Sequence, residues 1–294
     1  QKQYIKNKNY YMKVLVTGGA GFIGSHLCEE LSKDENEVYS LDNYSTGTVE
    51  NHVKNVIYIR GETKNIEKLI NFIPNVIYHL GEYSRVEQSF EDIEKVWSSN
   101  KDGIFSVLQF CRKVKAKIIY AGSSTKFGDG GFGRSQSPYA WTKASNTELV
   151  ENYSNWFGID YAITYFYNVY GGREISSGKY ATLIAIFIKQ YREKKPLTVV
   201  SPGIQLRNFT HIDDIIAGLV LVGNNGSGDN YGIGCSKSYS ILEIAEMFNT
   251  DIEMLPERNG NRMTAEVVCK KTKDLGWKER KSVKSYIENV VKGK

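Results

Sequence analysis

Cysteine and histidine are scarce in this chain of 294 residues, which contains four of each. The cysteines are isolated from one another and form no C-x-x-C pair: Cys28, Cys111, Cys235 and Cys269. The histidines are equally dispersed, at positions 26, 52, 79 and 211. Scattered cysteines indicate a reducing compartment and argue against a structural metal site. The sequence therefore predicts no zinc or iron ligand set and no bound metal.

Long apolar runs are also missing. No stretch approaches the length of a membrane span, and the N-terminus lacks the apolar core of a signal peptide. The sequence thus predicts no membrane association and a cytoplasmic location. The residues before Met12 are expected to be an appended or frayed extension, because the first predicted strand comes directly after Met12.

The net charge of +5 is mild, and much of it lies in two lysine-rich end segments, QKQYIKNKNYYMK and KKTKDLGWKERKSVKSYIENVVKGK. Other residue types interleave these lysines and no aromatic–basic motif accompanies them, so we expect solvated surface and no nucleic-acid binding. A weak positive field still favours anionic nucleotide substrates. The length allows one large domain or two modest ones.

The most informative stretch is Lys13–Gly24, KVLVTGGAGFIG. Its apolar start predicts a buried strand, and an amphipathic helical pattern comes after the glycines. The glycines recur every three residues, at Gly18, Gly21 and Gly24. A strand, a glycine turn and a helix in this order present backbone N–H groups and a helix N-terminus to a phosphate. The stretch predicts a dinucleotide-binding turn.

A second signal supports this prediction. The next strand, Val38–Leu41, ends in Asp42, at the distance where dinucleotide-binding units place a ribose-binding acid. A carboxylate there accepts hydrogen bonds from both ribose hydroxyls and repels a 2′-phosphate. We therefore predict NAD rather than NADP.

Strands and helices alternate through the first half of the chain. After Asp42 the predicted strands are 56–60, 75–80, 117–121 and 160–166, and the predicted helices are 64–72, 90–114 and 138–157. Ser137 and Pro138 form an N-cap and a first helical position. This alternation predicts an α/β fold with a parallel sheet covered on both faces.

The regular alternation of strands and helices ends after Gly171-Gly172, where the predicted elements become shorter. We divide the chain into residues 12–171, which would bind NAD and carry the catalytic side chains, and residues 172–294. The second part is expected to form a smaller α/β substrate-binding region over the C-terminal ends of the strands, from which the chain can cross back to the sheet.

Tyr139 and Lys143 lie four residues apart, on one face of the helix predicted after Pro138. An ammonium beside a phenol favours the phenolate. Tyr139 is therefore a candidate general base for a sugar hydroxyl, with hydride leaving the adjacent carbon for NAD. Ser123, just past a predicted strand, is placed to hydrogen-bond the same hydroxyl.

These motifs together resemble the extended short-chain dehydrogenases/reductases, in the nucleotide-sugar epimerase/dehydratase group that includes UDP-glucose 4-epimerase. The matching pieces appear in the order of that family and span Val14 to Trp277: TGGAGFIG, LDNYSTG, YHLGEYS, AGSSTKFG, SPYAWTK, FYNVYGG, LRNFTHIDDI and DLGW. The resemblance implies a Rossmann-type doubly wound sheet. It also implies a tightly held NAD that takes a hydride from C4 of a nucleoside-diphosphate sugar.

The resemblance also assigns roles to single residues. It implies catalytic roles for Ser123, Tyr139 and Lys143. The cofactor contacts it implies are Gly18, Gly21, Phe22, Ile23, Gly24, Asp42, Asn43, Glu62, Leu80 and Lys143. The substrate contacts it implies are Ser123, Ser124, Tyr139, Asn168, Arg207 and Arg258. Arginines suit a diphosphate by charge and by the geometry of their donors.

The two residues after Ser123 indicate which reaction of the group to expect. In the family's 4,6-dehydratases they are Asp and Glu, whereas here they are Ser124 and Thr125. Elimination of water needs an acid and a base, so this difference favours a 4-epimerase acting through a transient 4-keto sugar. We interpret Lys126 as an exposed turn lysine and Glu82 as a carboxylate paired with Arg85, although either would be an unorthodox acid–base group in a dehydratase.

Two further alternatives are a C4 dehydrogenase or reductase and a non-catalytic NAD-sensing protein. The intact Ser-Tyr-Lys set disfavours the sensor. The resemblance also implies a homodimer formed by the helices predicted at 90–114 and 139–157. Trp97, Phe105, Trp156 and Phe157 would supply its apolar contacts, unless they face the sheet.

Overall fold

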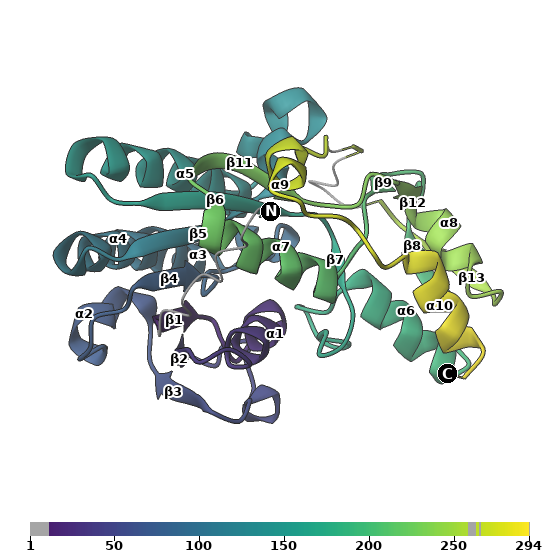
Figure 1. Cartoon of the computed structure of the whole chain (residues 1–294). Helices are drawn as coiled ribbons and strands as arrows, with labels where there is room; N and C mark the ends of the chain where they lie inside the picture. The colour runs from purple at the N-terminus through teal and green to yellow at the C-terminus, as the bar shows by residue number, and fades with distance from the viewer. Residues whose placement is uncertain (1–11, 258–262, 265, 294) are drawn as a thin grey trace, which may run out of the picture.

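The computed structural model describes residues 12–257, 263–264 and 266–293. Its centre is a sheet of seven parallel strands in the order β11-β6-β5-β4-β1-β2-β3 (Figure 1). The strands are β1 (Lys13–Thr17), β2 (Glu37–Asp42), β3 (Val56–Arg60), β4 (Val76–His79), β5 (Lys117–Ser123), β6 (Tyr161–Phe166) and β11 (Gly228–Ile233). The predicted doubly wound α/β fold is confirmed. The strand order reverses between β1 and β4, which is where such sheets bind ligands.

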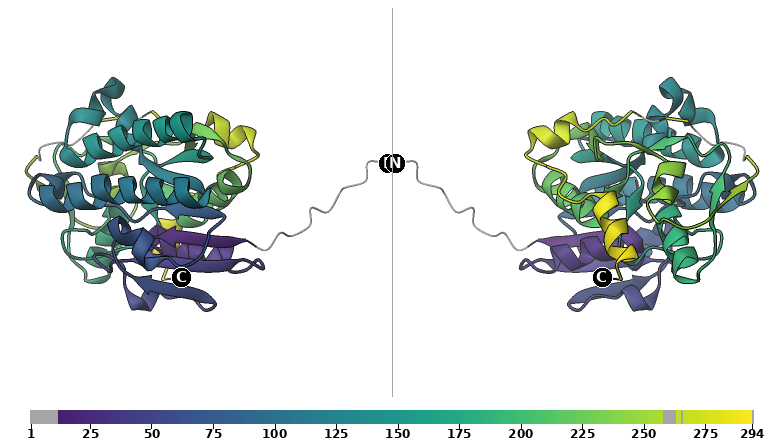
Figure 2. Two further views of the ribbon diagram at one scale, coloured as in Figure 1. Left: turned by 90° about the vertical axis from the view of Figure 1, so that its left-hand side faces the viewer. Right: turned by 90° about the vertical axis from the view of Figure 1, so that its right-hand side faces the viewer.

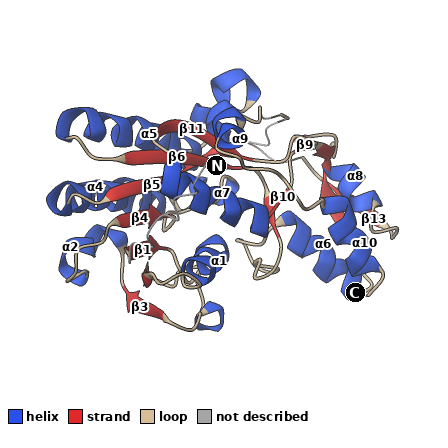
Figure 3. Ribbon diagram, in the orientation of Figure 1, coloured by secondary structure: helices blue, strands red, loops and turns tan. Residues whose placement is uncertain are grey.

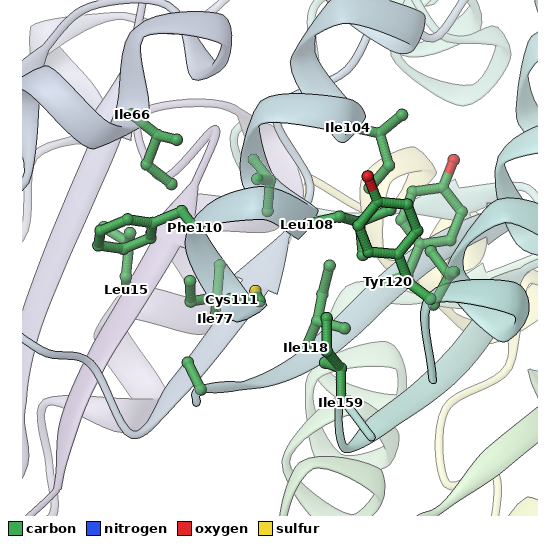
Figure 4. Packing of buried hydrophobic residues seen from close by; sticks show 14 of the residues in the cluster. Leu15, Ile66, Ile77, Ile104, Leu108, Phe110, Cys111, Ile118, Tyr120 and Ile159 are labelled. Atoms are coloured by element: carbon green, nitrogen blue, oxygen red, sulfur yellow. The ribbon is translucent and has the colours of Figure 1, made fainter. Parts of the chain in front are cut away.

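Helices cover both faces of this sheet (Figure 3). On one face lie α2 (Ile66–Leu69), α4 (Gly103–Val114) and α5 (Pro138–Phe157), and on the other lie α1 (Phe22–Leu31) and α7 (Ile212–Asn225). Side chains alternate along β1, so that Leu15 packs into the first core, whereas Val14 and Val16 pack into the second. Figure 4 shows the first core, where Leu108 and Cys111 of α4 meet strand residues.

The continuous helix predicted over 90–114 is wrong in its first half. The chain forms a 3₁₀ turn (Glu87–Phe90), α3 (Ile93–Val96) and a π-helical segment (Trp97–Asp102) before α4 begins. A buried asparagine accompanies the π turn. Asn100 accepts from the Tyr83 backbone N–H at 2.7 Å, and its carbonyl accepts from Asn146 Nδ2 at 2.7 Å. These tertiary hydrogen bonds compete with regular helix formation.

The helix predicted at 64–72 is shorter than expected. It comprises a 3₁₀ turn (Thr63–Asn65) and α2, because the backbone is already extended at Ile70. In the second part of the chain, α6 (Leu183–Arg192) begins after an extended Thr182. By contrast, α5 begins as predicted, because the Ser137 hydroxyl accepts from the Ala140 N–H at 3.0 Å and Pro138 comes next.

A smaller C-terminal lobe stands at the carboxyl ends of the strands. Its short strands pair as β8 (Leu197–Val200) with β13 (Ile252–Leu255), β9 (Leu206–Arg207) with β12 (Tyr239–Ser240), and β7 (Val169–Tyr170) with β10 (Thr210–His211). Its helices α6, α8 (Ile241–Glu246) and α10 (Val283–Val291) share a third core. The right-hand view in Figure 2 looks onto α6 and α10.

The chain crosses between the two parts more than once. After leaving the sheet at β6 it returns through α7 and β11, and α9 (Lys270–Asp274) then packs on β11. The predicted division at residue 171 therefore lies close to where the C-terminal lobe begins, while residues 212–233 belong to the sheet layer. No helix in the described ranges has the length and apolar character needed to cross a bilayer.

Candidate active site

A cavity of about 1120 Å³ opens at the carboxyl ends of the strands, between the sheet and the C-terminal lobe. The glycine turn lies along its wall, as do the loops after β2, β4 and β5, the start of α5, and the segment between β7 and α6. This volume exceeds the range of about 300–1,000 Å³ that is typical of sites for a single small molecule. Fifteen residues predicted for the site line this one cavity: Gly18, Gly21, Phe22, Ile23, Gly24, Asp42, Asn43, Glu62, Leu80, Ser123, Ser124, Tyr139, Lys143, Asn168 and Arg207.

The glycine turn is packed so closely against neighbouring backbone that side chains have no room at two of its positions. Gly18 adopts a φ of +74°, and a Cβ there would lie 2.9 Å from Cα of Gly81. A Cβ on Gly24 would overlap the carbonyl oxygen of Gly18. Gly21 is the N-cap of α1, so the first N–H groups of this ten-residue helix face the cavity. The turn fits a pyrophosphate on its backbone.

Asp42 lies at the end of β2 and lines the cavity. Its Oδ2 accepts from the Ala20 N–H at 2.9 Å and its Oδ1 from the Tyr44 N–H at 2.7 Å. The buried carboxylate therefore ties the glycine turn to the loop after β2. Each oxygen retains acceptor capacity for a ribose hydroxyl.

Ser123, Tyr139 and Lys143 reach the cavity from two adjacent elements. Ser123 ends β5, and its hydroxyl shares a 2.8 Å hydrogen bond with the Thr125 hydroxyl. Tyr139 is the second residue of α5, and Lys143 lies one turn later on the same helix face. Lys143 is buried whereas Tyr139 is partly exposed, so the ammonium lies deeper than the phenol.

Glu82 is the first correction to the sequence interpretation, because its partner is Lys143 and not Arg85. Oε2 of Glu82 lies 2.5 Å from Nζ of Lys143, and the Glu82 side chain is only 2% exposed. Arg85 instead donates through Nε and Nη2 to the carbonyl oxygen of Tyr180. Burial alone would raise the pKa of Glu82, but the Lys143 ammonium and His79 outweigh it and hold that pKa at about 2.

Lys126 is the second correction. It is not an exposed turn lysine, since Nζ donates to Tyr165 Oη at 3.1 Å and forms an ion pair with Asp229 at 3.1 Å. Tyr165 donates in turn to Asp229 at 2.7 Å. Ser124 and Thr125 line the cavity, whereas these three residues do not. The Lys126 ammonium thus ties the turn after β5 to β11.

Two of the predicted substrate residues, Asn168 and Arg207, lie toward the C-terminal lobe. Asn168 holds a φ of +39° between β6 and β7, and its Nδ2 donates to the carbonyl oxygen of Asn208 at 3.3 Å. A positive φ at a non-glycine residue is common at functional sites. Arg207 lies on β9 at the cavity wall. Arg258 falls outside the described residues.

Sequence reasoning missed two polar residues of the cavity. Glu174 accepts from the Gly171 N–H at 2.8 Å and from the Thr182 hydroxyl at 2.6 Å, and burial raises its pKa to about 7. Gln205 is buried, and its Oε1 has no hydrogen-bond partner among the described residues. Neither residue belongs to a motif with a readable spacing. Only the folding of the C-terminal lobe brings them to the cavity.

Comparisons with known proteins agree with this geometry. The model of the NAD-dependent epimerase/dehydratase family matches residues 14–234. The uncharacterized UDP-glucose epimerase YtcB of Bacillus subtilis is 31% identical over 80% of this chain and 81% of its own length. UDP-glucuronic acid decarboxylase 3 of Arabidopsis thaliana is 28% identical over 92% of this chain and 85% of its own length.

Solved structures of related proteins share this fold. The crystal structure of Thermus thermophilus UDP-glucose 4-epimerase in complex with NAD superposes with a TM-score of 0.86 at 26% identity, covering 96% of this chain and 98% of that one. The relatives and structural neighbours include epimerases, dehydratases and decarboxylases of nucleotide sugars. The chain belongs to the NAD-dependent epimerase/dehydratase family.

Proposed function

We propose that this protein is an NAD-dependent nucleotide-sugar 4-epimerase. The glycine turn and Asp42 suit the pyrophosphate and a ribose of NAD, with Asn43, Glu62 and Leu80 along the same wall. Ser123, Ser124, Tyr139, Asn168 and Arg207 line the remainder of the cavity and are proposed to hold the sugar diphosphate. NAD, when bound, would supply the redox chemistry: it would accept a hydride from C4 of the sugar and return it to the same carbon.

The protein side chains have separate tasks in this proposal. Tyr139, as phenolate, removes the proton of the C4 hydroxyl. Ser123 hydrogen-bonds the same oxygen and keeps it in line with Tyr139. Lys143 donates to the nicotinamide ribose. The 4-keto sugar then turns within the cavity, and Tyr139 returns the proton when the opposite face of C4 is reduced.

One observation carries the choice of epimerization over dehydration. The residues next to Ser123 along the cavity wall are Ser124 and Thr125, which carry hydroxyls. Elimination of water across C5 and C6 needs an acid and a base near both carbons. Lys126 forms an ion pair with Asp229, and Glu82 forms an ion pair with Lys143. Neither residue is therefore available for this task.

A second candidate is decarboxylation of a nucleotide-linked hexuronic acid, and Arg85 favours it. This guanidinium lines the cavity and donates hydrogen bonds to the carbonyl oxygens of Ser84 and Tyr180. No carboxylate pairs with Arg85 among the described residues, so it suits a substrate carboxylate. A 4-keto uronic acid is a β-keto acid, which loses carbon dioxide without a dedicated acid–base pair.

Product analysis tests the proposal. The purified protein is incubated with UDP- and GDP-linked hexoses, N-acetylhexosamines and hexuronic acids, and the products are examined by mass spectrometry. A product isomeric with its substrate supports epimerization. A product lighter by one water indicates a dehydratase, and one lighter by carbon dioxide indicates a decarboxylase. NAD binding without turnover on any sugar would favour the sensor.

A further inference from the structure

A buried carboxylate stands behind the predicted catalytic lysine, in the loop after β4. The side chains of Glu82 and Lys143 are 2% and 7% exposed, so their ion pair is shielded from water. Lys143 also donates to the carbonyl oxygen of Ala121, and its ammonium lies 4.6 Å from the centre of the Tyr120 ring. Tyr120 stands among the core residues shown in Figure 4.

Glu82 is surrounded by donors. Oε2 accepts from Lys143 at 2.5 Å and from the Tyr120 hydroxyl at 2.9 Å. Oε1 accepts from Asn146 Nδ2 at 3.2 Å and lies 3.3 Å from His79 Nε2. Three of the about four acceptor positions of a carboxylate are thus engaged by hydrogen bonds, and His79 adds a close contact. This environment holds Glu82 in its ionised form.

The neighbouring elements fix the orientation of these donors. Lys101 donates to Asn146 Oδ1 at 2.8 Å, which turns Nδ2 of Asn146 toward Glu82. Thr17 Oγ1 accepts from the N–H groups of Leu80 and Gly81 at 3.1 and 3.0 Å. Its own proton is then left for His79 Nδ1 at 2.8 Å. Nε2, the other ring nitrogen of His79, lies 3.3 Å from Oε1 of Glu82.

Lys143 has three N–H donors, and two are engaged by Glu82 and Ala121. Within the part of the chain that the structure describes, the third donor has no hydrogen-bond partner and remains for a ligand. The charge of the ammonium is paired with an equal and opposite charge at contact distance, so a group farther away experiences a dipole and not a lone cation.

We propose that Glu82 is a positioning residue that orients Lys143 and cancels its charge, so that Tyr139 faces a neutral ion pair. The role of Tyr139 in this inference rests on the proposed function. The other titratable groups facing the pair are His79, Tyr120 and Lys101, and Arg85 interacts electrostatically with Tyr139. The test variants leave these four unchanged, except for the Tyr120 control.

The test is a pH titration of Tyr139 in the NAD-saturated protein. The ultraviolet absorbance of tyrosinate is recorded for each variant and for the same variant carrying Tyr139→Phe, and the difference gives the midpoint of Tyr139. Glu82→Gln keeps the shape but removes the anion, and we expect the midpoint to fall by about one pH unit. Tyr120→Phe removes a hydrogen bond to the same oxygen without changing charge, and its midpoint should stay at the wild-type value.

The double variant Glu82→Gln/Lys143→Met guards against misfolding, because it leaves no uncompensated buried charge. Its midpoint should lie within about half a unit of the wild type, since the pair is already neutral as seen from Tyr139. A rise of a unit or more in the double variant, or an unchanged or raised midpoint in Glu82→Gln, overturns the proposal. The titration needs no sugar, so it remains decisive if no nucleotide sugar is epimerized. If epimerization holds, the acidic limb of the kcat profile of Glu82→Gln moves in the same direction.

Discussion

Nζ of Lys126 lies 3.1 Å from Oδ2 of Asp229, so a side chain from the turn after β5 is held by the last strand of the sheet. Ser124 and Thr125, in the same turn, line the cavity, but Lys126 does not. The position where a dehydratase would need proton-transfer chemistry therefore carries hydroxyl residues at the cavity wall, while the amine of Lys126 is paired with Asp229.

Replacement of Lys126 by methionine should accordingly cost stability and leave the identity of the product unchanged. The partly buried ion pair and the hydrogen bond to Tyr165 together are worth about 1–2 kcal/mol of unfolding free energy. Urea unfolding and product analysis measure the two effects separately. Lys113→Met is the matched control, since its pair with Glu67 is exposed and should contribute under about 0.5 kcal/mol. A Lys126→Met variant that folds normally but forms no product would assign Lys126 to catalysis.

Substitution Tyr139→Phe removes the proposed base and little else, because Tyr139 is partly exposed at the start of α5. We expect kcat to fall by about 10²- to 10⁴-fold, the usual contribution of general acid–base catalysis. NAD affinity should change little, since the glycine turn and Asp42 are untouched. Kinetics and calorimetric NAD titration provide the two readouts. Wild-type turnover in this variant is incompatible with the mechanism.

Local signals in the sequence predicted much of the fold and fifteen of the residues that line the cavity. The glycine turn, Asp42 and the Ser137-Pro138 helix start are defined by neighbouring residues, so the pattern placed them correctly. Fifteen predicted site residues line one cavity because parallel strands bring their carboxyl ends together.

The incorrect predictions from the sequence concern residues whose partners lie far away along the chain. Glu82 and Lys143 are 61 residues apart, and Lys126 and Asp229 are 103 apart, so no local spacing links either pair. The π-helical segment depends in the same way on hydrogen bonds from the Tyr83 N–H to Asn100 and from Asn146 to Asn100. Periodicity reports which face of a helix is apolar, but not which distant polar group interrupts it.

Glu174 should make stability depend on pH. Its pKa is raised from 4.5 to about 7 in the folded state, so its ionisation is more costly there than in the unfolded chain. This stabilising contribution is complete below pH about 4.5 and is lost as the pH rises through about 7. Relative to Glu174→Gln, the wild type should lose up to about 3 kcal/mol of unfolding free energy between pH 5 and pH 8.

Urea unfolding of the two proteins at several pH values measures this difference. The amide can still accept from the Gly171 N–H and donate to the Thr182 hydroxyl, so the variant should fold. Glu91→Gln, at an exposed position, serves as the control. Parallel curves for the wild type and Glu174→Gln would show that Glu174 is not the titrating group.

The predicted homodimer can be tested on the helix surface. Trp97, Phe105, Trp156 and Phe157 are all exposed in the single chain, so they do not face the sheet. Trp97 also stacks on the exposed Trp141, with ring centroids 6.1 Å apart. We expect a dimer by light scattering at micromolar concentration and a monomer after Phe105→Glu, because a buried charge opposes association.

Phe132→Glu is the control for this experiment. Phe132 is also exposed, but it lies in the turn Asp129–Ser135 and not on α4 or α5, so the dimer should persist. A monomeric wild type, or equal behaviour of the two variants, would contradict the predicted interface.

The most direct test of the proposed 4-epimerase is to trace a deuterium atom placed at C4 of an accepted nucleotide sugar. The mechanism predicts that the isomeric product retains the deuterium at C4, with the configuration inverted, as measured by NMR and mass spectrometry. Deuterium recovered at C6 of a product lighter by one water would contradict the account and identify a 4,6-dehydratase. Deuterium recovered in released reduced cofactor would instead identify a C4 dehydrogenase.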